Sequence, residues 1–183
     1  MTQIAIILVV LLALTFAVSY LGKRLTKRQR QWMLIGLGAV YIFGNLYFTL
    51  LTRTPGETQI LRLVPFNAYK RIAGNWKVSS EPIENLANGF LFGITPAEEV
   101  VLNVLLYYPM GYLLSAWFGK EKLWRAILIG CLCSAATEFL QYLFKMGWCE
   151  TDDVMHNTLG TAIGVWVWYL QGKRRKADAL PKG

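Results

Sequence analysis

Charged residues are scarce in this chain: they make up 16% of its 183 residues, whereas 55% are hydrophobic. A soluble domain averages about 25% charged and about 45–50% apolar residues, so this composition favours a membrane protein. A single histidine and the lack of a CxxC pair argue against a zinc site. The chain also lacks a P-loop, an HExxH motif and a nucleophile elbow. We therefore expect no metal and no cofactor, and no catalytic class is indicated.

The three cysteines do not predict a disulfide framework, since their number is odd. Cys131 and Cys133 lie in one apolar run, and two residues on a helix that are this close in sequence point in different directions. Cys149 falls in a short connection. All three are expected to be free thiols.

Five apolar runs have the length of a membrane span, for which about 20 residues are needed. Capping boxes at Thr26-x-x-Gln29 and Thr95-x-x-Glu98 mark two helix starts. The predicted fold is an all-α integral membrane helical bundle with five transmembrane helices, forming one domain over residues 1–183. The predicted spans are 4–21, 32–51, 99–118, 123–144 and 154–170.

Residues 52–98 form the long connection between the second and third spans. Apolar residues between Ile83 and Ile94 recur at helical spacing, which predicts a short interfacial helix. The apolar stretch Leu61–Asn67 is interrupted by Pro65 and is expected to lie at the membrane interface.

The net charge of +8 would suggest nucleic acid in a soluble protein. Here the basic residues flank apolar runs, so membrane topology explains them better, and no nucleic-acid partner is expected. They gather at 23–30, 120–125 and 173–182, and most acidic residues lie in the other connections. The positive-inside rule then predicts a multi-pass plasma-membrane protein with the N-terminus outside and a basic cytoplasmic tail at 171–183.

With this topology, polar side chains gather at the outer ends of several spans. Glu138 and Gln141 share one face of the fourth helix, and a charge inside hydrocarbon costs roughly 2.5 to 3.5 kcal/mol, so an acid there indicates a functional site. The proposed pocket consists of Glu138, Gln141, Asp152, Asp153, Asn157, Asn103 and Arg53. Supporting residues are His156, Arg62 and Glu99, and Gly160 and Gly164 are expected to allow close helix packing.

Simpler roles exist for several of these residues. Asp152 and Asp153 could cap the positive end of the fifth helix, and His156 could pair with Asp152 one turn away. Asn157 could serve helix packing. Glu138 lies too deep for capping, so its alternatives are a functional role or a structural ion pair with Arg53 or Arg62.

The runs NVLLYYPMGYLL from Asn103, Glu138-x-x-Gln141 and ETDDVMHNTLGTAIG from Glu150 resemble the VanZ-like family of small membrane proteins. LTR at 51–53 and LVPFN at 63–67 fit the same family. The resemblance implies a bacterial plasma membrane, a Gram-positive source and a link to resistance against teicoplanin and related lipoglycopeptides. Many members carry an arginine shortly before the acidic pair, where this chain has Gly147-Trp148-Cys149-Glu150.

Three functions fit the predicted pocket. It could bind a cell-envelope amphiphile, such as a lipid-linked precursor or a lipoglycopeptide, among the membrane lipids. It could instead be a hydrolase or transferase in which Glu138 and Asp153 act as acid and base. A small transporter ranks last, because the sequence shows neither an internal repeat nor paired broken helices.

Overall fold

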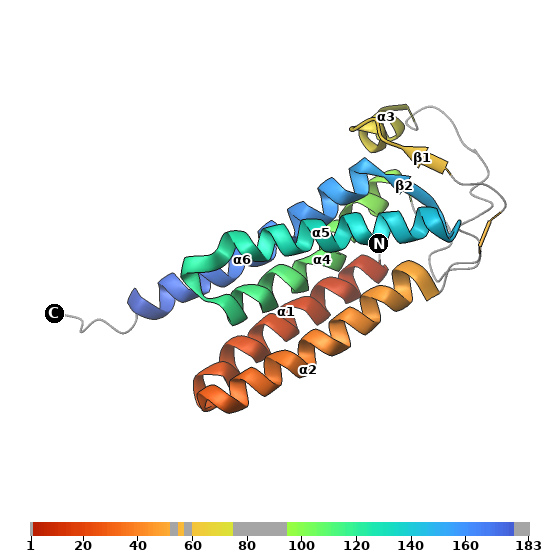
Figure 1. Ribbon diagram of the computed structural model, residues 1–183. Helices are drawn as coiled ribbons and strands as arrows, with labels where there is room; N and C mark the ends of the chain where they lie inside the picture. Colours follow the sequence, from red (N-terminus) through yellow and green to blue (C-terminus); the bar gives the residue numbers. More distant parts are fainter. Residues whose placement is uncertain (1, 52–54, 57–59, 75–94, 178–183) are drawn as a thin grey trace.

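The computed structural model describes residues 2–51, 55–56, 60–74 and 95–177, and this part of the chain is predominantly helical. Five long helices run side by side along the molecule (Figure 1). They are α1 (Thr2–Arg24), α2 (Lys27–Leu46), α4 (Pro96–Phe118), α5 (Leu123–Leu143) and α6 (Thr151–Ala177).

Four helical segments are long and apolar enough to cross a membrane, namely Ile4–Arg24, Lys27–Leu51, Pro96–Phe118 and Lys120–Leu143. They correspond to the first four predicted spans. Helix α6 has 27 residues, which is long enough, but it is not among these segments because acids, amides and hydroxyls interrupt its apolar residues. The fifth span over 154–170 therefore stays a prediction.

Both predicted capping boxes are present. The Thr26 hydroxyl accepts a hydrogen bond from the Gln29 backbone N–H at 3.3 Å, and the Gln29 side chain accepts one from the Thr26 N–H at 3.0 Å. Thr95 and Glu98 form the same pair at the start of α4. These bonds satisfy backbone donors that have no partner inside the helix, and so they fix where α2 and α4 begin.

Helices α4 and α6 cross with their backbones in contact. A methyl group added to Gly160 would overlap the carbonyl oxygen of Val104, and one added to Gly164 would overlap that of Tyr108. A glycine at each position thus lets the two helices approach to this distance. This contact sets the position of α6 against α4, and α5 packs along both.

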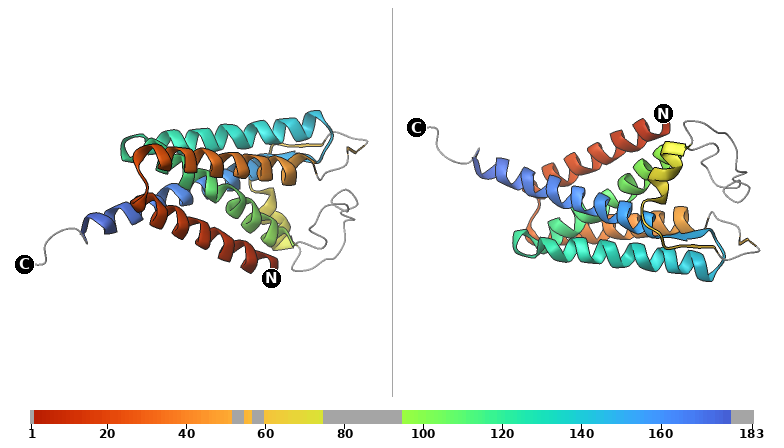
Figure 2. Two further views of the ribbon diagram at one scale, coloured as in Figure 1. Left: turned by 90° about the horizontal axis from the view of Figure 1, so that it is seen from below. Right: turned by 90° about the horizontal axis from the view of Figure 1, so that it is seen from above.

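Helices α1 and α2 lie close together at their own connection and diverge from each other towards the opposite end (Figure 2), where the end of α2 contacts α5. The buried apolar cluster that joins them to α4 lies close to that connection, and it consists of Val18, Leu34, Tyr112, Leu113 and Ala116. Arg30 donates to the Ala116 carbonyl oxygen at 3.0 Å beside this cluster. We call this end of the molecule, which also carries the C-terminus, the basic end.

The other end, here called the polar end, carries three short elements: β1 (Ile60–Arg62), α3 (Asn67–Gly74) and β2 (Trp148–Glu150) (Figure 1). The strands pair in parallel, with Leu61 opposite Cys149. The all-α prediction missed these strands, since each has three residues and no alternation that marks it. The interfacial helix predicted over Ile83–Ile94 lies outside the described residues. We refer to Ile60–Gly74 as the β1–α3 segment.

Candidate functional site

Glu138 and Gln141 lie on the buried face of α5 at the polar end, where their exposed fractions are 3% and 2%. A carboxylate oxygen of Glu138 accepts a hydrogen bond from the backbone N–H of Glu150 in β2 at 2.9 Å. The Gln141 amide donates at 2.9 Å to the Thr49 carbonyl oxygen. Thr49 lies in η1 (Tyr47–Leu51), a π-helical turn that ends α2, where backbone carbonyls depart from the regular α-helical ladder. One face of α5 thus fixes both β2 and the end of α2.

Asp152 holds the β1–α3 segment against the start of α6. Its two carboxylate oxygens accept hydrogen bonds from the backbone N–H groups of Phe66 and Ala68, each at 2.6 Å. These donors belong to the N-terminus of α3, which favours a negative charge. Asp152 was predicted to cap its own helix, α6. It instead caps the start of α3.

Helices α4, α5 and α6 meet through amide side chains. The Asn103 amide of α4 donates to an Asp153 carboxylate oxygen of α6 at 2.7 Å. One turn further along α6, the Asn157 amide donates to the Ser134 hydroxyl of α5 at 2.8 Å. The predicted residues Asn103, Asp153 and Asn157 are thus brought together, and Ser134 joins them.

The side-chain oxygens of two buried amides have no hydrogen-bond donor within the described residues. Gln141 Oε1 and Asn157 Oδ1 are buried, and within the described part of the chain neither accepts a hydrogen bond. A buried acceptor without a donor costs about 1–3 kcal/mol. Each atom can accept a hydrogen bond from a buried water, which is the common partner of such groups in protein interiors.

Glu150 is the acid at the centre of the site, and sequence reasoning did not single it out. It is 4% exposed and accepts bonds from Arg62 and Arg71, at 3.1 Å each. Arg71 also reaches Glu99 of α4 at 3.3 Å, and the Arg62 guanidinium lies 3.5 Å above the centre of the Trp148 ring. Both arginines belong to the β1–α3 segment. Arg62 was predicted as a supporting residue, whereas Arg71, like Glu150, was not predicted from the sequence.

Carboxylate oxygens of Glu99, Glu150 and Asp153 lie within 4.8 Å of one another. Three such acids could supply part of the oxygen shell of a divalent cation, and Ca²⁺ takes about six to eight oxygens. Arg71, however, already bonds to Glu99 and Glu150, so its guanidinium balances charge at this position. The grouping is an ion-pair network by its contacts, and we assign no metal to it.

His156 is 2% exposed, and its Nε2 lies 3.1 Å from the Tyr69 hydroxyl of α3. The two rings are also in edge contact, with centroids 5.6 Å apart. The predicted pairing with Asp152 is replaced by this contact, because Asp152 bonds to the α3 backbone. Arg53, the predicted counter-ion, lies outside the described residues.

The pKa of the Cys149 thiol depends on the negative charges of the site. Partial burial raises the pKa of its thiol, and the negative charges of Glu138, Asp153 and Glu150 raise it further. A thiolate is therefore disfavoured beside these acids. The cysteines within the described residues are free, as predicted.

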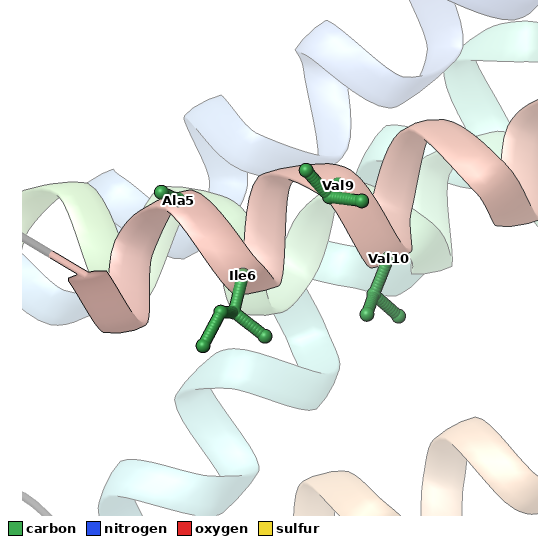
Figure 3. A pocket seen from close by; sticks show the side chains of 4 residues that line it. All are labelled: Ala5, Ile6, Val9 and Val10. Atoms are coloured by element: carbon green, nitrogen blue, oxygen red, sulfur yellow. The ribbon is translucent and has the colours of Figure 1, made fainter.

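The shallow hollow on α1 has a different character from the polar site. Ala5, Ile6, Val9 and Val10 line it, and all four side chains are hydrocarbon (Figure 3). Ile6, Val9 and Val10 are each more than half exposed. Such a surface suits contact with acyl chains and offers nothing that would orient a polar ligand.

Comparison with known families identifies this arrangement. The family model described as VanZ/LLP1 matches residues 4–172, which cover all five long helices. The chain belongs to the VanZ/LLP1 family. Family membership and the four helices that are long and apolar enough to cross a membrane together make the chain a membrane protein.

Similarity to characterised members is low. The chain is 26% identical over 84 residues to Protein VanZ of Enterococcus faecium, an alignment that covers 46% of this chain and 52% of that protein. This VanZ/LLP1 protein thus matches about half the length of that relative. No solved structure matches the chain.

Proposed function

We propose that this VanZ/LLP1 protein binds a cell-envelope amphiphile at its polar end, and that this binding underlies resistance to teicoplanin and related lipoglycopeptides. The observation that carries the proposal is the ion-pair network of Glu150, Arg62, Arg71 and Glu99, set above the buried acid Glu138. The network lies at the end of helices whose outward surfaces are apolar. A ligand there meets polar groups and hydrocarbon together.

The exposure of the network shows which members can touch a ligand. Arg62, Arg71 and Glu99 have side chains that are 27–31% exposed, whereas Glu150 is 4% exposed. The accessible rim therefore offers two guanidinium groups, which suit the phosphate or carboxylate of a head group. A lipid-linked sugar precursor and a lipoglycopeptide both combine these groups with an acyl chain.

The proposed orientation places the polar end outside the cell, with five spans, the N-terminus outside and the C-terminus in the cytoplasm. Charge supports this choice. Arg30 lies at the basic end, and the Lys120 and Lys173 ammonium groups lie there at 5.4 and 5.0 Å from the centroid of the Tyr169 ring. The positive-inside rule assigns such an end to the cytoplasm. The pocket then belongs to the outer leaflet of the plasma membrane.

Binding can be tested on the full-length protein in phospholipid nanodiscs, with teicoplanin and a polyprenyl-pyrophosphate-linked sugar as two separate probes. We expect Arg71→Gln to weaken binding of at least one probe about tenfold or more, since a hydrogen bond to a charged group contributes about 1.5–3 kcal/mol. Glu121→Gln, which changes an exposed residue at the basic end, is the matched control and should bind like wild type. If wild type binds neither probe, or if Arg71→Gln binds both as well as the control does, the proposal is wrong.

A second candidate is acid/base catalysis on a lipid-linked precursor. The observation in its favour is the closeness of Glu99, Glu150 and Asp153, whose carboxylate oxygens lie within 4.8 Å of one another and could exchange a proton with a bound substrate. Glu138 accepts a hydrogen bond from the Glu150 backbone N–H, and the Glu150 carboxylate lies within 4.8 Å of that of Asp153, so both acids of the predicted pair lie beside Glu150. Lipid mass spectrometry of nanodiscs with added precursor separates the two functions. Loss of the precursor with wild type, but not with Glu138→Gln, would indicate catalysis, and an unchanged precursor would indicate binding.

A further inference from the structure

The β1–α3 segment carries its apolar side chains on the outside and its guanidinium groups on the inside. Leu61, Leu63, Val64 and Phe66 are 50–63% exposed, whereas Arg62 and Arg71 are 28% and 27% exposed. A segment that faces water shows the opposite distribution, because leucine and phenylalanine avoid water and arginine does not. The arrangement indicates an apolar surrounding.

Backbone geometry produces this division. In an extended chain, successive side chains point to opposite sides, so Leu61 and Leu63 share one side and Arg62 takes the other. Arg62 points to Glu150, which fixes the inward side. The parallel pairing of β1 with β2 then holds Leu61 on the outward side.

The segment is attached firmly enough to keep this orientation. Asp152 accepts two hydrogen bonds from its backbone, and the Thr151 hydroxyl donates to the Leu63 carbonyl oxygen at 3.1 Å. Phe66 has φ of 68°, a conformation that non-glycine residues adopt rarely and at a cost of order 1–3 kcal/mol. That turn brings the N–H groups of Phe66 and Ala68 to the same carboxylate. The exposed apolar residues are therefore held in place by bonds on their inward side.

The apolar surface of the segment continues onto the bundle. Tyr69 contacts His156, and the neighbouring α6 residues Met155 and Leu159 are exposed and apolar. The segment is bonded to the first turn of α6, so it lies where a membrane-spanning helix leaves the hydrocarbon. Tyrosine is typical of that level in a bilayer.

We infer that the β1–α3 segment inserts its outward side, Leu61, Leu63, Val64, Phe66 and Tyr69, into the membrane at the boundary between head groups and acyl chains. Its partner is a lipid surface. A contiguous exposed apolar patch on a helical membrane protein fits this partner, and amphipathic interfacial segments bury their apolar side by about 5–10 Å. The inference needs the bundle to cross the membrane and does not depend on the ligand proposed above.

A consequence concerns access to the site. Arg62 and Arg71 lie on the inward side of the same segment whose outward side touches lipid. An amphiphile in the leaflet beside the segment thus has its head group at the level of the two arginines.

Photocrosslinking tests the insertion on full-length protein in nanodiscs of phosphatidylglycerol and phosphatidylcholine. Benzoylphenylalanine replaces Val64 in one variant and Phe66 in another, both exposed positions whose side chains serve no described hydrogen bond. Lys145, exposed in the turn between α5 and β2 at the same end, is the control position. We expect about tenfold more lipid adduct at Val64 and Phe66 than at Lys145, measured by mass spectrometry.

Two results would overturn the inference. One is lipid adduct at Val64 and Phe66 no higher than at Lys145, which would place the segment in water. The other is crosslinking of Val64 and Phe66 to a polypeptide in place of lipid, which would make the patch a protein interface. Neither result bears on whether teicoplanin or the polyprenyl-pyrophosphate-linked sugar binds. Membrane insertion and ligand binding are therefore tested independently.

Discussion

Replacing Asp152 by asparagine gives the sharpest test of how the site is assembled. The carboxylate accepts two backbone hydrogen bonds of 2.6 Å, one with each oxygen. An asparagine has one acceptor oxygen, and its NH2 group would face a backbone N–H donor. The variant therefore loses one charge-assisted bond and leaves one donor without a partner, while its side chain keeps the same shape.

The expected magnitude follows from these two changes. A hydrogen bond to a charged group contributes about 1.5–3 kcal/mol, and a buried N–H without a partner costs a similar amount. Ala68 is 2% exposed, so water cannot readily replace the lost acceptor at its N–H. Because the two costs partly describe the same lost bond, we expect a net loss of about 2–4 kcal/mol in the free energy that docks the β1–α3 segment. This corresponds to roughly a 30- to 1,000-fold increase in the equilibrium constant for detachment of the segment.

Hydrogen–deuterium exchange of the full-length protein in nanodiscs measures this detachment directly. Peptides that cover α3 should exchange faster in Asp152→Asn by that factor, and peptides from α4 should not change. Asp153→Asn is the matched control, because it removes the same charge one residue away and its bonded partner Asn103 lies on α4. Exchange of α3 that is equal in the two variants, or within about threefold of wild type in Asp152→Asn, would refute the role given to Asp152.

Two further predictions concern helix packing and the charge of the site. Gly160→Ala should lower the stability of the detergent-solubilised protein by about 1–3 kcal/mol or more in thermal unfolding, because its methyl group would overlap the Val104 carbonyl oxygen. Gly36→Ala, where no atom lies within 4 Å of the added methyl, should be neutral or slightly stabilising, and equal effects would contradict the packing. Cys149 should react slowly with a thiol reagent at neutral pH, since its raised pKa keeps the thiol protonated. Glu138→Gln removes one negative neighbour, lowers that pKa and should speed alkylation at pH 8 in peptide mass spectrometry; an unchanged rate would mean that Glu138 carries no charge there.

The positions of the helices could be predicted from the sequence, because their signals are local. An apolar run of sufficient length and a capping box at its start act within one segment of chain, and the boxes at Thr26 and Thr95 form as expected. Free cysteines, the two basic connections at 23–30 and 120–125 and the acids in the first turn of α6 are also local features. The fifth span is the exception, because the polar residues that build the site weaken the apolar signal of α6.

Glu138, Asn103 and Asp153 lie at the same end of the bundle, as the sequence predicts, because position along a helix fixes how far each residue lies from the helix end. Their partners do not follow from it. The bond between Arg71 and Glu150 joins residues 79 positions apart, and it exists because β1 pairs with β2. A pairing of two three-residue strands has no periodicity that a sequence could reveal.

Asp152 shows the same division within one residue. That an aspartate in the first turn of a helix should interact with backbone N–H groups is a rule of local chemistry. Which N–H groups it binds depends on the turn at Phe66, which brings a second helix N-terminus to its carboxylate. The helices, and the end of the bundle at which their polar side chains gather, can be predicted from the sequence, since they depend on hydrophobic length and helical spacing. The hydrogen bonds cannot, because they depend on contacts between residues far apart in the chain.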